Sequence, residues 1–297
     1  MKKSMINGYA VDIGGTKTAA AKILGGVVVK RMNKSTDGGL SIDQQLDAIE
    51  DILVQLGWQR SGETIGLTVT GRVSASGQWS AVNSDIMTEL SEAPLASLAT
   101  KRFGPSLVSN DASATTLAEY HFGSGQGANS FIYLTVSTGV GGGIIINGNP
   151  VQSARGLAGH VGFSTVKIAS TLCGCGREGT VESIASGTAI ARMAAEQGYE
   201  GLTGRDVFEA SFSGQEWADR IIDKSAKAMA ELCANLTAIL DPDCIAIGGS
   251  VGMANGYIER VRRHLADEPA LFRCSLVKAS MGPDGPLFGA LIYRTKR

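Results

Sequence analysis

The sequence has little of what marks secreted, membrane-bound or nucleic-acid-binding proteins. Its five cysteines in 297 residues are too few for a disulfide framework, and we interpret Cys233, Cys244 and Cys274 as small buried apolar residues. The 27 basic and 28 acidic residues nearly cancel and form no basic run, which argues against nucleic-acid and membrane surfaces. No apolar stretch approaches the roughly 18 to 20 residues of a membrane span, and residues 1–6 lead into a predicted strand rather than a signal peptide. We therefore expect a cytoplasmic protein whose partners are small neutral or anionic metabolites.

Two common nucleotide-binding motifs are also absent. The chain contains neither the G-x-x-x-x-G-K-[ST] sequence of a P-loop nor the G-x-G-x-x-G spacing of a dinucleotide-binding fold. Its 39 glycines lie instead in tight turns and at helix ends, without a low-complexity tract. The length leaves room for two domains, each with a core of its own.

The first notable glycine turn lies in residues 9–24. An apolar strand reaches Asp12, and a second strand follows the turn. The turn consists of Gly14, Gly15 and Thr16, and Lys17 follows it. Glycines there let backbone N–H groups approach an anion, and a carboxylate at the mouth is placed to hold Mg²⁺ against nucleotide phosphates, directly or through water. The pattern predicts a phosphate-binding hairpin, although an ordinary hairpin can also carry two glycines.

Two later stretches also carry glycine turns, the first of them in a second hairpin. Residues 131–147 again predict strand, small polar turn and strand. The turn carries Thr138, Gly139, Gly141, Gly142 and Gly143. Residues 245–252 predict a buried strand that ends at Gly248 and Gly249, the place where an α/β sheet exposes a ligand crevice. Three such turns in one chain favour a nucleotide site over ordinary hairpins.

Periodicity places the other elements. Apolar residues at helical spacing predict helices over 41–56, 95–103, 181–193, 217–239 and 258–265, with Ser41 as the N-cap of the first. Apolar runs predict strands over 25–32, 64–69, 106–109 and 274–277. A final helix from residue 285 to 293 is expected to pack on the first domain.

Asp111 follows the short strand over 106–109 and begins a helix that runs toward Gly123. A carboxylate at a helix N-terminus is favoured by the helix dipole. We therefore expect Asp111 to be ionised at neutral pH and able to accept a proton. From position alone, the alternative is that Asp111 serves only as the N-cap of this helix.

Three motifs occur in order: Asp12-Ile-Gly-Gly-Thr-Lys17, Ser137-Thr-Gly-Val-Gly-Gly-Gly143 and Gly248-Gly-Ser250. They resemble the motifs of the ROK family of bacterial sugar kinases, within the actin/hexokinase-like ATPase superfamily, and the resemblance covers essentially the whole chain. Within that family the sequence is most similar to the N-acetylmannosamine kinases. That similarity is carried by residues 135–143, 156–160, 173–176 and 181–187.

The resemblance implies a two-domain α/β chain with the actin/hexokinase-like, ribonuclease H-like fold and an active site in the interdomain cleft. We expect residues 1–112 and 285–297 to form the N-terminal domain and residues 113–284 the C-terminal domain. The implied reaction is the phosphorylation of N-acetylmannosamine at O6 by ATP with Mg²⁺, a step of sialic acid catabolism. The family also implies a homodimer.

The resemblance further implies a role for individual residues. Asp111 matches the catalytic base, which would take the proton of the 6-hydroxyl group as that oxygen attacks the γ-phosphoryl group. ATP and Mg²⁺ binding falls to Asp12, Gly14, Gly15, Thr16, Lys17, Thr138, Gly139, Gly141, Gly248 and Gly249. Sugar binding falls to Gly71, Arg72, Asn83, Asn110, His160 and Glu182. The match at Asn83 is loose, and without the resemblance Glu182 is typical of a solvated helix start.

The segment around His160 departs from the family pattern. Most members have a glutamate where this chain has His160 and a zinc-binding histidine where it has Phe163, and bacterial N-acetylmannosamine kinases share the first replacement. Thr180 stands where the family has a third cysteine, so only Cys173 and Cys175 of four zinc ligands remain. Structural zinc keeps four protein ligands, so we predict a loop without zinc, held by Phe163 packing. The lost histidine also removes a sugar contact, which leaves the acceptor sugar open.

Other functions remain compatible with these motifs. A glucokinase or N-acetylglucosamine kinase of the same family is the nearest, and His160 in place of glutamate speaks against glucose. A sugar-sensing repressor would carry an N-terminal DNA-binding domain, whereas here the first hairpin starts almost at Met1. A non-catalytic sugar sensor is opposed by the presence of Asp12, Asn110 and Asp111.

Overall fold

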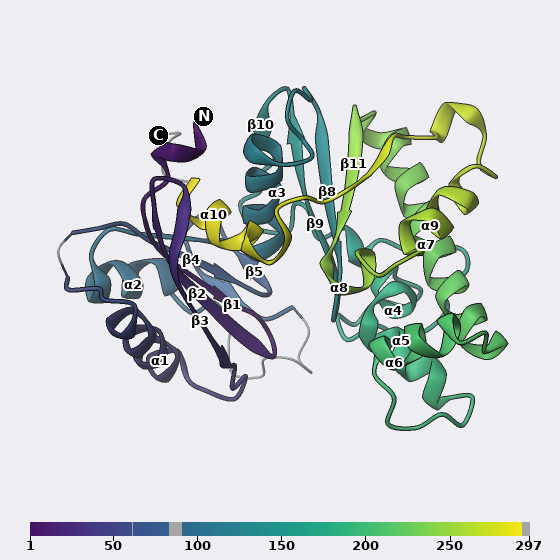
Figure 1. Cartoon of the computed structure of the whole chain (residues 1–297), viewed down its shortest axis with the longest axis horizontal. Coiled ribbons are helices and arrows are strands. Elements are labelled where there is room, and N and C mark those ends of the chain that lie inside the picture. The colour runs from purple at the N-terminus through teal and green to yellow at the C-terminus, as the bar shows by residue number, and fades with distance from the viewer. Residues whose placement is uncertain (61, 83–90, 293–297) are drawn as a thin grey trace. The chain divides into compact units, whose positions relative to one another are not determined.

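The computed structural model describes residues 1–60, 62–82 and 91–292, and the chain divides into two compact units, whose elements are labelled in Figure 1. Unit 1 comprises residues 1–123, 151–158 and 283–297, and unit 2 comprises residues 124–150 and 159–282. The chain leaves unit 1 after Gly123, whereas the sequence placed the boundary at residue 112. The short segment 151–158 then returns to unit 1.

Unit 1 is built on a mixed sheet of five strands in the order β3-β2-β1-β4-β7. The strands are β1 (Gly8–Ile13), β2 (Lys17–Leu24), β3 (Val27–Ser35), β4 (Ile65–Val69) and β7 (Ser106–Asn110). The first three are antiparallel neighbours, whereas β1, β4 and β7 run parallel. A short ribbon of β5 (Arg72–Val73) and β6 (Trp79–Ser80) follows β4. The residues that follow β1, β4 and β7 therefore lie at one edge of the sheet.

One face of this sheet is covered by α1 (Ile42–Gln55) and α2 (Leu95–Phe103). Tyr9 and Val11 of β1 point to that face and share a buried core with both helices. The predicted cap of α1 is confirmed, because the Ser41 side chain accepts a hydrogen bond from the Gln44 N–H group in a capping box.

The other face is covered by α10 (Gly285–Ile292), which packs on β1, β4 and α3 (Asp111–Phe122). Glycines allow the close approach: a Cβ atom on Gly66 would lie 2.7 Å from the Ala290 Cβ atom, and one on Gly289 would lie 1.9 Å from the Ala114 carbonyl oxygen. The last helix thus packs on the first unit, as predicted.

Unit 2 repeats the plan with a sheet of order β10-β9-β8-β11-β12. The strands are β8 (Phe131–Val136), β9 (Val140–Ile146), β10 (Asn149–Pro150), β11 (Cys244–Gly248) and β12 (Leu276–Lys278). The predicted hairpin pairs β8 with β9 antiparallel, and β11 runs parallel to both β8 and β12. Each unit therefore places a glycine hairpin beside parallel strands.

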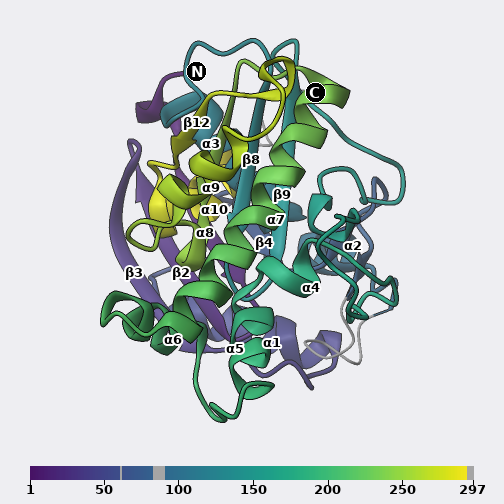
Figure 2. The ribbon, with the colours of Figure 1, turned by 90° about the vertical axis from the view of Figure 1, so that its right-hand side faces the viewer.

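The helices of unit 2 gather around a long central helix (Figure 2). They are α4 (Glu182–Ala185), α5 (Gly187–Ala195), α6 (Gly204–Phe212), α7 (Glu216–Leu240), α8 (Gly249–Gly252) and α9 (Tyr257–Leu265). The long helix is α7, against which α4, α5, α6 and α9 pack. It ends at Asp241, which has a φ of 42° and precedes Pro242, as predicted.

The predicted helix over 181–193 is wrong as a single element. The backbone of Ser186 is extended, and its side chain accepts a hydrogen bond from the Ala189 N–H group, so it ends α4 and caps α5. Short 3₁₀ helices lie at Lys3–Met5, Val161–Phe163, Ala270–Phe272 and Gly282–Asp284. Within the described ranges, no helix is both long and apolar enough to span a bilayer.

Candidate active site

Asp12 lies near the carboxyl end of β1, at the sheet edge where the parallel strands of unit 1 end. It is in register with Thr68 of β4, which in turn pairs with Ser109 of β7. The buried Thr68 hydroxyl group donates a hydrogen bond of 2.7 Å to Asp12 Oδ1. Thr68 therefore fixes the orientation of this carboxylate.

Asp111 is the first residue of α3, and Asn110 rather than Asp111 is the N-cap. Asn110 Oδ1 accepts the Ser113 N–H group at 3.0 Å. Asp111 Oδ1 accepts the Ala112 N–H group and the Asn110 side-chain amide, both at 2.8 Å. The alternative in which Asp111 only caps the helix is therefore wrong, because its neighbour does so.

The two carboxylates have raised pKa values. Burial, followed by the charge of Asp111, raises the pKa of Asp12 to about 7, against the lowering effects of Thr68 and Arg31. Burial raises the pKa of Asp111 to about 6, opposed by hydrogen bonds from the backbone and from Asn110. Asp111 therefore stays mostly ionised at pH 7, as expected, but burial outweighs the helix dipole. Because the two carboxylates repel each other, one proton stays bound to the pair up to near-neutral pH.

Gly71 follows β4 and has a φ of +91°, and a Cβ atom there would lie 2.5 Å from the Ser80 carbonyl oxygen. Its own carbonyl oxygen accepts the Asn110 side-chain amide at 2.8 Å. Arg72 donates to the Arg155 carbonyl oxygen at 3.0 Å. The structure thus brings Gly71 and Asn110 together, whereas Asn83 lies outside the described residues.

The first glycine turn is closed by its own backbone. The Gly14 N–H group donates to the Lys17 carbonyl oxygen at 3.0 Å, so it is not the anion donor that the sequence suggested. A Cβ atom on Gly14 would lie 2.9 Å from the same oxygen, which explains the glycine. The side chains of Thr16 and Lys17 are exposed.

The second glycine turn, in unit 2, is anchored by the N-terminus of α5. The carbonyl oxygens of Ser137 and Thr138 accept the N–H groups of Gly187 at 2.7 Å and Thr188 at 3.3 Å. A Cβ atom on Gly249 would lie 2.4 Å from the Val136 carbonyl oxygen. Two of the three glycine turns, those at Thr138 and Gly249, therefore meet at the end of β8.

Glu182 is the first residue of α4 and contacts this turn, so it is not a solvated helix-start residue. It is partly buried, and its Oε2 atom accepts the Val140 N–H group at 2.9 Å. A Cβ atom on Gly139 would lie 2.6 Å from the same oxygen. The Cys173 thiol donates a weak hydrogen bond to Oε1 at 3.8 Å. Glu182 thus links the cysteine loop to the hairpin.

His160 and Phe163 lie side by side, with stacked rings whose centroids are 5.9 Å apart. The Arg177 side chain donates to the Phe163 carbonyl oxygen at 2.6 Å. Thr180 is fully buried near Cys173. Within the described ranges, no three His, Cys, Asp or Glu side chains converge as a metal site. The predicted absence of zinc stays a prediction.

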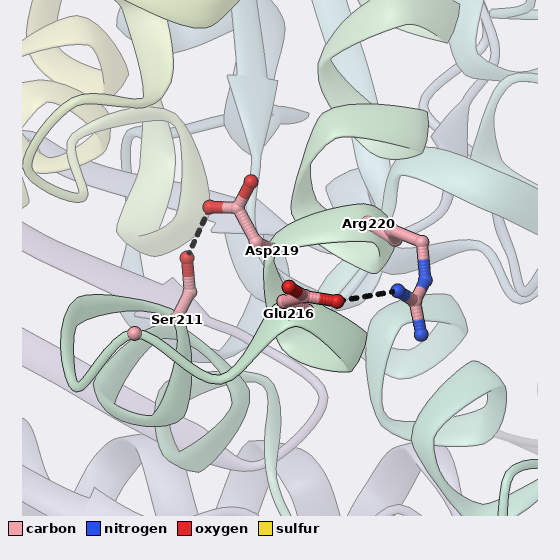
Figure 3. Close-up of a pocket in the computed structure, with 5 residues that line it drawn as sticks. Ser211, Glu216, Asp219 and Arg220 are labelled. Carbon is pink, nitrogen blue, oxygen red and sulfur yellow. Dashed lines mark hydrogen bonds and ion pairs between the residues drawn. The ribbon is translucent and has the colours of Figure 1, made fainter.

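Sequence reasoning missed Thr68, although one signal was present: it is the only polar residue in the apolar strand Ile65–Val69. It also missed a pocket of about 290 Å³ between α6 and α7 in unit 2 (Figure 3). The pocket is lined by Ser211, Gly214, Glu216, Asp219 and Arg220. Its polar groups pair with one another, as Ser211 does with Asp219 at 3.0 Å and Glu216 with Arg220 at 3.5 Å. We therefore assign it no role.

Comparison with known proteins gives consistent results. A model of the ROK family matches residues 8–297. N-acetylmannosamine kinases from Haemophilus influenzae and Escherichia coli are 38% and 37% identical to this chain over 285 residues, covering 96% and 95% of it and 94% and 96% of those kinases. The solved structure of a ROK family glucokinase from Streptomyces griseus, in complex with glucose and AMPPNP, is 27% identical and has a TM-score of 0.81 over 96% of this chain and 98% of that chain. The likeness confirms the predicted actin/hexokinase-like fold.

Proposed function

This chain belongs to the ROK family, and we propose that it is an ATP-dependent kinase that phosphorylates N-acetylmannosamine at O6. The observation that carries the proposal is the identity of 36 to 38% to N-acetylmannosamine kinases along nearly the whole chain. The product would be N-acetylmannosamine 6-phosphate, an intermediate of sialic acid catabolism. We further propose that the enzyme is cytoplasmic and homodimeric.

Asp111 serves as the general base. Its carboxylate accepts the proton of the sugar 6-hydroxyl group while O6 forms a bond to the γ-phosphorus, and the bond from that phosphorus to the bridging oxygen of ATP breaks. ADP leaves with the bonding electron pair. A pKa of about 6 keeps Asp111 ionised at pH 7 yet makes it a better base than an ordinary aspartate.

Asp12 fits a role in holding Mg²⁺. Its carboxylate lies near a second one, and both have raised pKa values, so a hard cation with oxygen ligands would relieve their repulsion. Mg²⁺ in kinases takes one or two carboxylates together with substrate phosphates, and when bound it neutralises phosphate charge. Thr68 holds the Asp12 carboxylate in place for this role.

The glycine turns would receive the phosphates. In unit 1 this set is Gly14, Gly15, Thr16 and Lys17, and in unit 2 it is Thr138, Gly139, Gly141, Gly248 and Gly249. Gly14 contributes the shape of its turn rather than its N–H group. The sugar would contact Gly71, Arg72, Asn83, Asn110, His160 and Glu182. His160, in place of the family's usual glutamate, favours a hexosamine over glucose.

An assay of ADP release tests the proposal. The purified protein would be supplied with Mg-ATP and, in turn, N-acetylmannosamine, N-acetylglucosamine, mannose and glucose. We expect kcat/KM to be highest for N-acetylmannosamine. A preference for glucose or N-acetylglucosamine would assign the chain to the alternative kinases of the family, and no turnover of any sugar would favour a sensor.

A further inference from the structure

Two cysteines that have no part in the proposed reaction lie together in unit 2. Cys233 is on α7, and Cys274 lies between the 3₁₀ helix at Ala270–Phe272 and β12. Cys274 packs against the apolar core that contains Cys233, and the two side chains are hydrogen-bonded to each other. Thr237, one turn further along α7, contacts both residues: its hydroxyl group lies 2.8 Å from the Cys233 carbonyl oxygen, and its side chain also interacts with Cys274.

The shared hydrogen bond makes the two thiol groups unequal. A hydrogen bond from the Cys233 thiol, with a further one from the Thr237 side chain, lowers the pKa of Cys274 to about 7, against the effect of burial. The same hydrogen bond, together with burial, raises the pKa of Cys233 well above its usual value. Cys233 is therefore the donor, and about half of Cys274 is thiolate at neutral pH.

Access to solvent differs in the same direction. Cys233 is fully buried, as expected from the sequence, whereas Cys274 is only partly buried. A reagent in solution therefore meets the Cys274 sulfur first, with the Cys233 sulfur behind it. A partly exposed thiolate with a second thiol beside it is the arrangement found in cysteines that sense oxidants.

We propose that Cys274 and Cys233 form a peroxide-sensitive thiol pair, in which Cys274 is the attacking residue and Cys233 the resolving one. The Cys274 thiolate attacks one oxygen of hydrogen peroxide. An S–O bond forms, the O–O bond breaks, and the hydroxide that leaves takes up a proton to become water. Cys274 is then a sulfenic acid.

The second step consumes the Cys233 thiol. Its sulfur loses the proton and attacks the Cys274 sulfur, so that an S–S bond forms while the S–O bond of the sulfenic acid breaks and a second water leaves. Two thiols are thereby oxidised to one disulfide, and one peroxide is reduced to two waters. The bond would join α7 to the segment before β12. This chemistry does not depend on the proposed kinase reaction.

Peptide mapping of the folded wild-type protein tests the inference. The protein would be treated with hydrogen peroxide at pH 7, its remaining thiols blocked with N-ethylmaleimide, and the sample digested without reduction. We expect a linked pair of peptides that contain Cys233 and Cys274, lighter by two hydrogen atoms than the separate peptides and released by dithiothreitol. Oxidation that leaves these two residues unlinked, or that links Cys274 to another cysteine, would overturn the inference.

Variants separate the two roles. Cys233→Ser removes the resolving sulfur but keeps a hydroxyl donor beside Cys274, so the sulfenic acid should accumulate on Cys274 and be trapped by dimedone. In Cys274→Ser, Cys233 should stay unmodified because it is fully buried. Dimedone labelling of Cys233 in that variant, or none of Cys274 in Cys233→Ser, would contradict the assigned roles.

Cys244 provides the matched control. It is also partly buried and lies near Cys274, because the N–H group of the next residue, Ile245, donates to the Ser275 carbonyl oxygen at 2.8 Å. Burial raises the pKa of Cys244, however. Iodoacetamide should therefore modify Cys274 of the wild-type protein at least about 10-fold faster than Cys244 at pH 7. Cys244→Ser should form the disulfide as wild type does. Equal rates, or loss of the disulfide in Cys244→Ser, would contradict the inference.

Discussion

The two units place different chemistry at the same position of the same sheet plan. Asp12 is the last residue but one of β1, and Thr135 is the last but one of β8. Asp12 pairs across the sheet with Ala19 and Thr68, whereas Thr135 pairs with Gly141 and Gly248. The topology thus fixes where a site can form, and the side chains in one row of the sheet decide what it does.

Each unit also holds a carboxylate against backbone N–H groups, with different consequences. In unit 1, Asp111 accepts from Ala112 and has a raised pKa. In unit 2, Glu182 accepts from Val140 and lies against Gly139. We infer that unit 1 supplies the proton-accepting chemistry and that Glu182 keeps the hairpin of unit 2 in shape.

The largest expected effect is on the proton transfer that we assign to unit 1. Asp111→Asn keeps the size and hydrogen-bonding shape of the side chain but cannot accept the proton, so we expect kcat to fall at least about 10²-fold with a melting temperature no lower than that of wild type. Steady-state kinetics with N-acetylmannosamine measures this. Asp243→Asn is the control, because Asp243 accepts the N–H groups of Asn129 and Ser130 in unit 2 and has no proposed part in the reaction. Near-normal turnover of Asp111→Asn would contradict the assignment of Asp111 in unit 1 as the general base.

A smaller effect is expected from the hairpin of unit 2. Gly139→Ala would place a methyl group 2.6 Å from Glu182 Oε2 and push this carboxylate off the Val140 N–H group. We expect the KM of ATP to rise and kcat/KM to fall about 10-fold, an effect of positioning rather than of proton transfer.

Gly39→Ala is the control for this change, since a Cβ atom there meets only Asp37 Oδ1 at 3.4 Å. It should leave kcat/KM unaltered. If Gly139→Ala behaved like Gly39→Ala, the assigned role of Glu182 in unit 2 would be wrong.

The pH dependence of stability sharpens the difference between the units. Asp12 has a folded-state pKa of about 7 against an ordinary value of 3.8, so the native state binds more protons than the unfolded chain between these values. The resulting stabilisation is complete below about pH 4 and is lost as the pH rises through about 7. Asp12→Asn should therefore raise the melting temperature relative to wild type by at least about 2 °C at pH 8, with less difference or a reversal at pH 4.

The melting temperatures are measured on the ligand-free protein, and the turnover of the variant is measured separately. We expect Asp12→Asn to be inactive although it is more stable at pH 8, because the carboxylate serves function at a cost to the fold. A variant that is less stable than wild type at pH 8 would contradict the raised pKa.

The smallest expected effect concerns the cysteine loop of unit 2. Cys173 and Cys175 lack the histidine and third cysteine that would complete a zinc site, and Phe163 stacks on His160 instead. Elemental analysis of the purified protein should therefore find well under one zinc per chain. One equivalent of zinc, with activity lost on its removal, would show that other groups complete the site.

Much of the fold was accessible from the sequence because hairpins, caps and periodic helices are local signals. The helix over 95–103 and the cap at Ser41 are examples. The break between the two helices at Ser186 could not be predicted from the sequence. It depends on the extended backbone of Ser186 and on the capping of the next helix by its side chain. The hydrogen bond from the Gly14 N–H group to the Lys17 carbonyl oxygen could not be predicted either, because it also depends on the backbone conformation of the folded turn.

The sequence predicted individual residues of the candidate site but not the hydrogen bonds that join them. Asp12 and Asp111 were identified from turn and helix positions, but Thr68 became apparent only from the strand register. The use of both Asn110 amide protons depends on the turn at Gly71, which lies 39 residues away in sequence. Such long-range contacts leave no pattern in a single sequence.

The identity of the reaction product decides whether this protein phosphorylates N-acetylmannosamine at O6. After incubation with Mg-ATP and N-acetylmannosamine, the sugar product would be analysed by proton–phosphorus correlation NMR. We expect one phosphorus signal coupled to the two protons on C6 of the sugar. Coupling to the proton on C1, or no phosphorylated N-acetylmannosamine at all under conditions in which another hexose is phosphorylated, would contradict it.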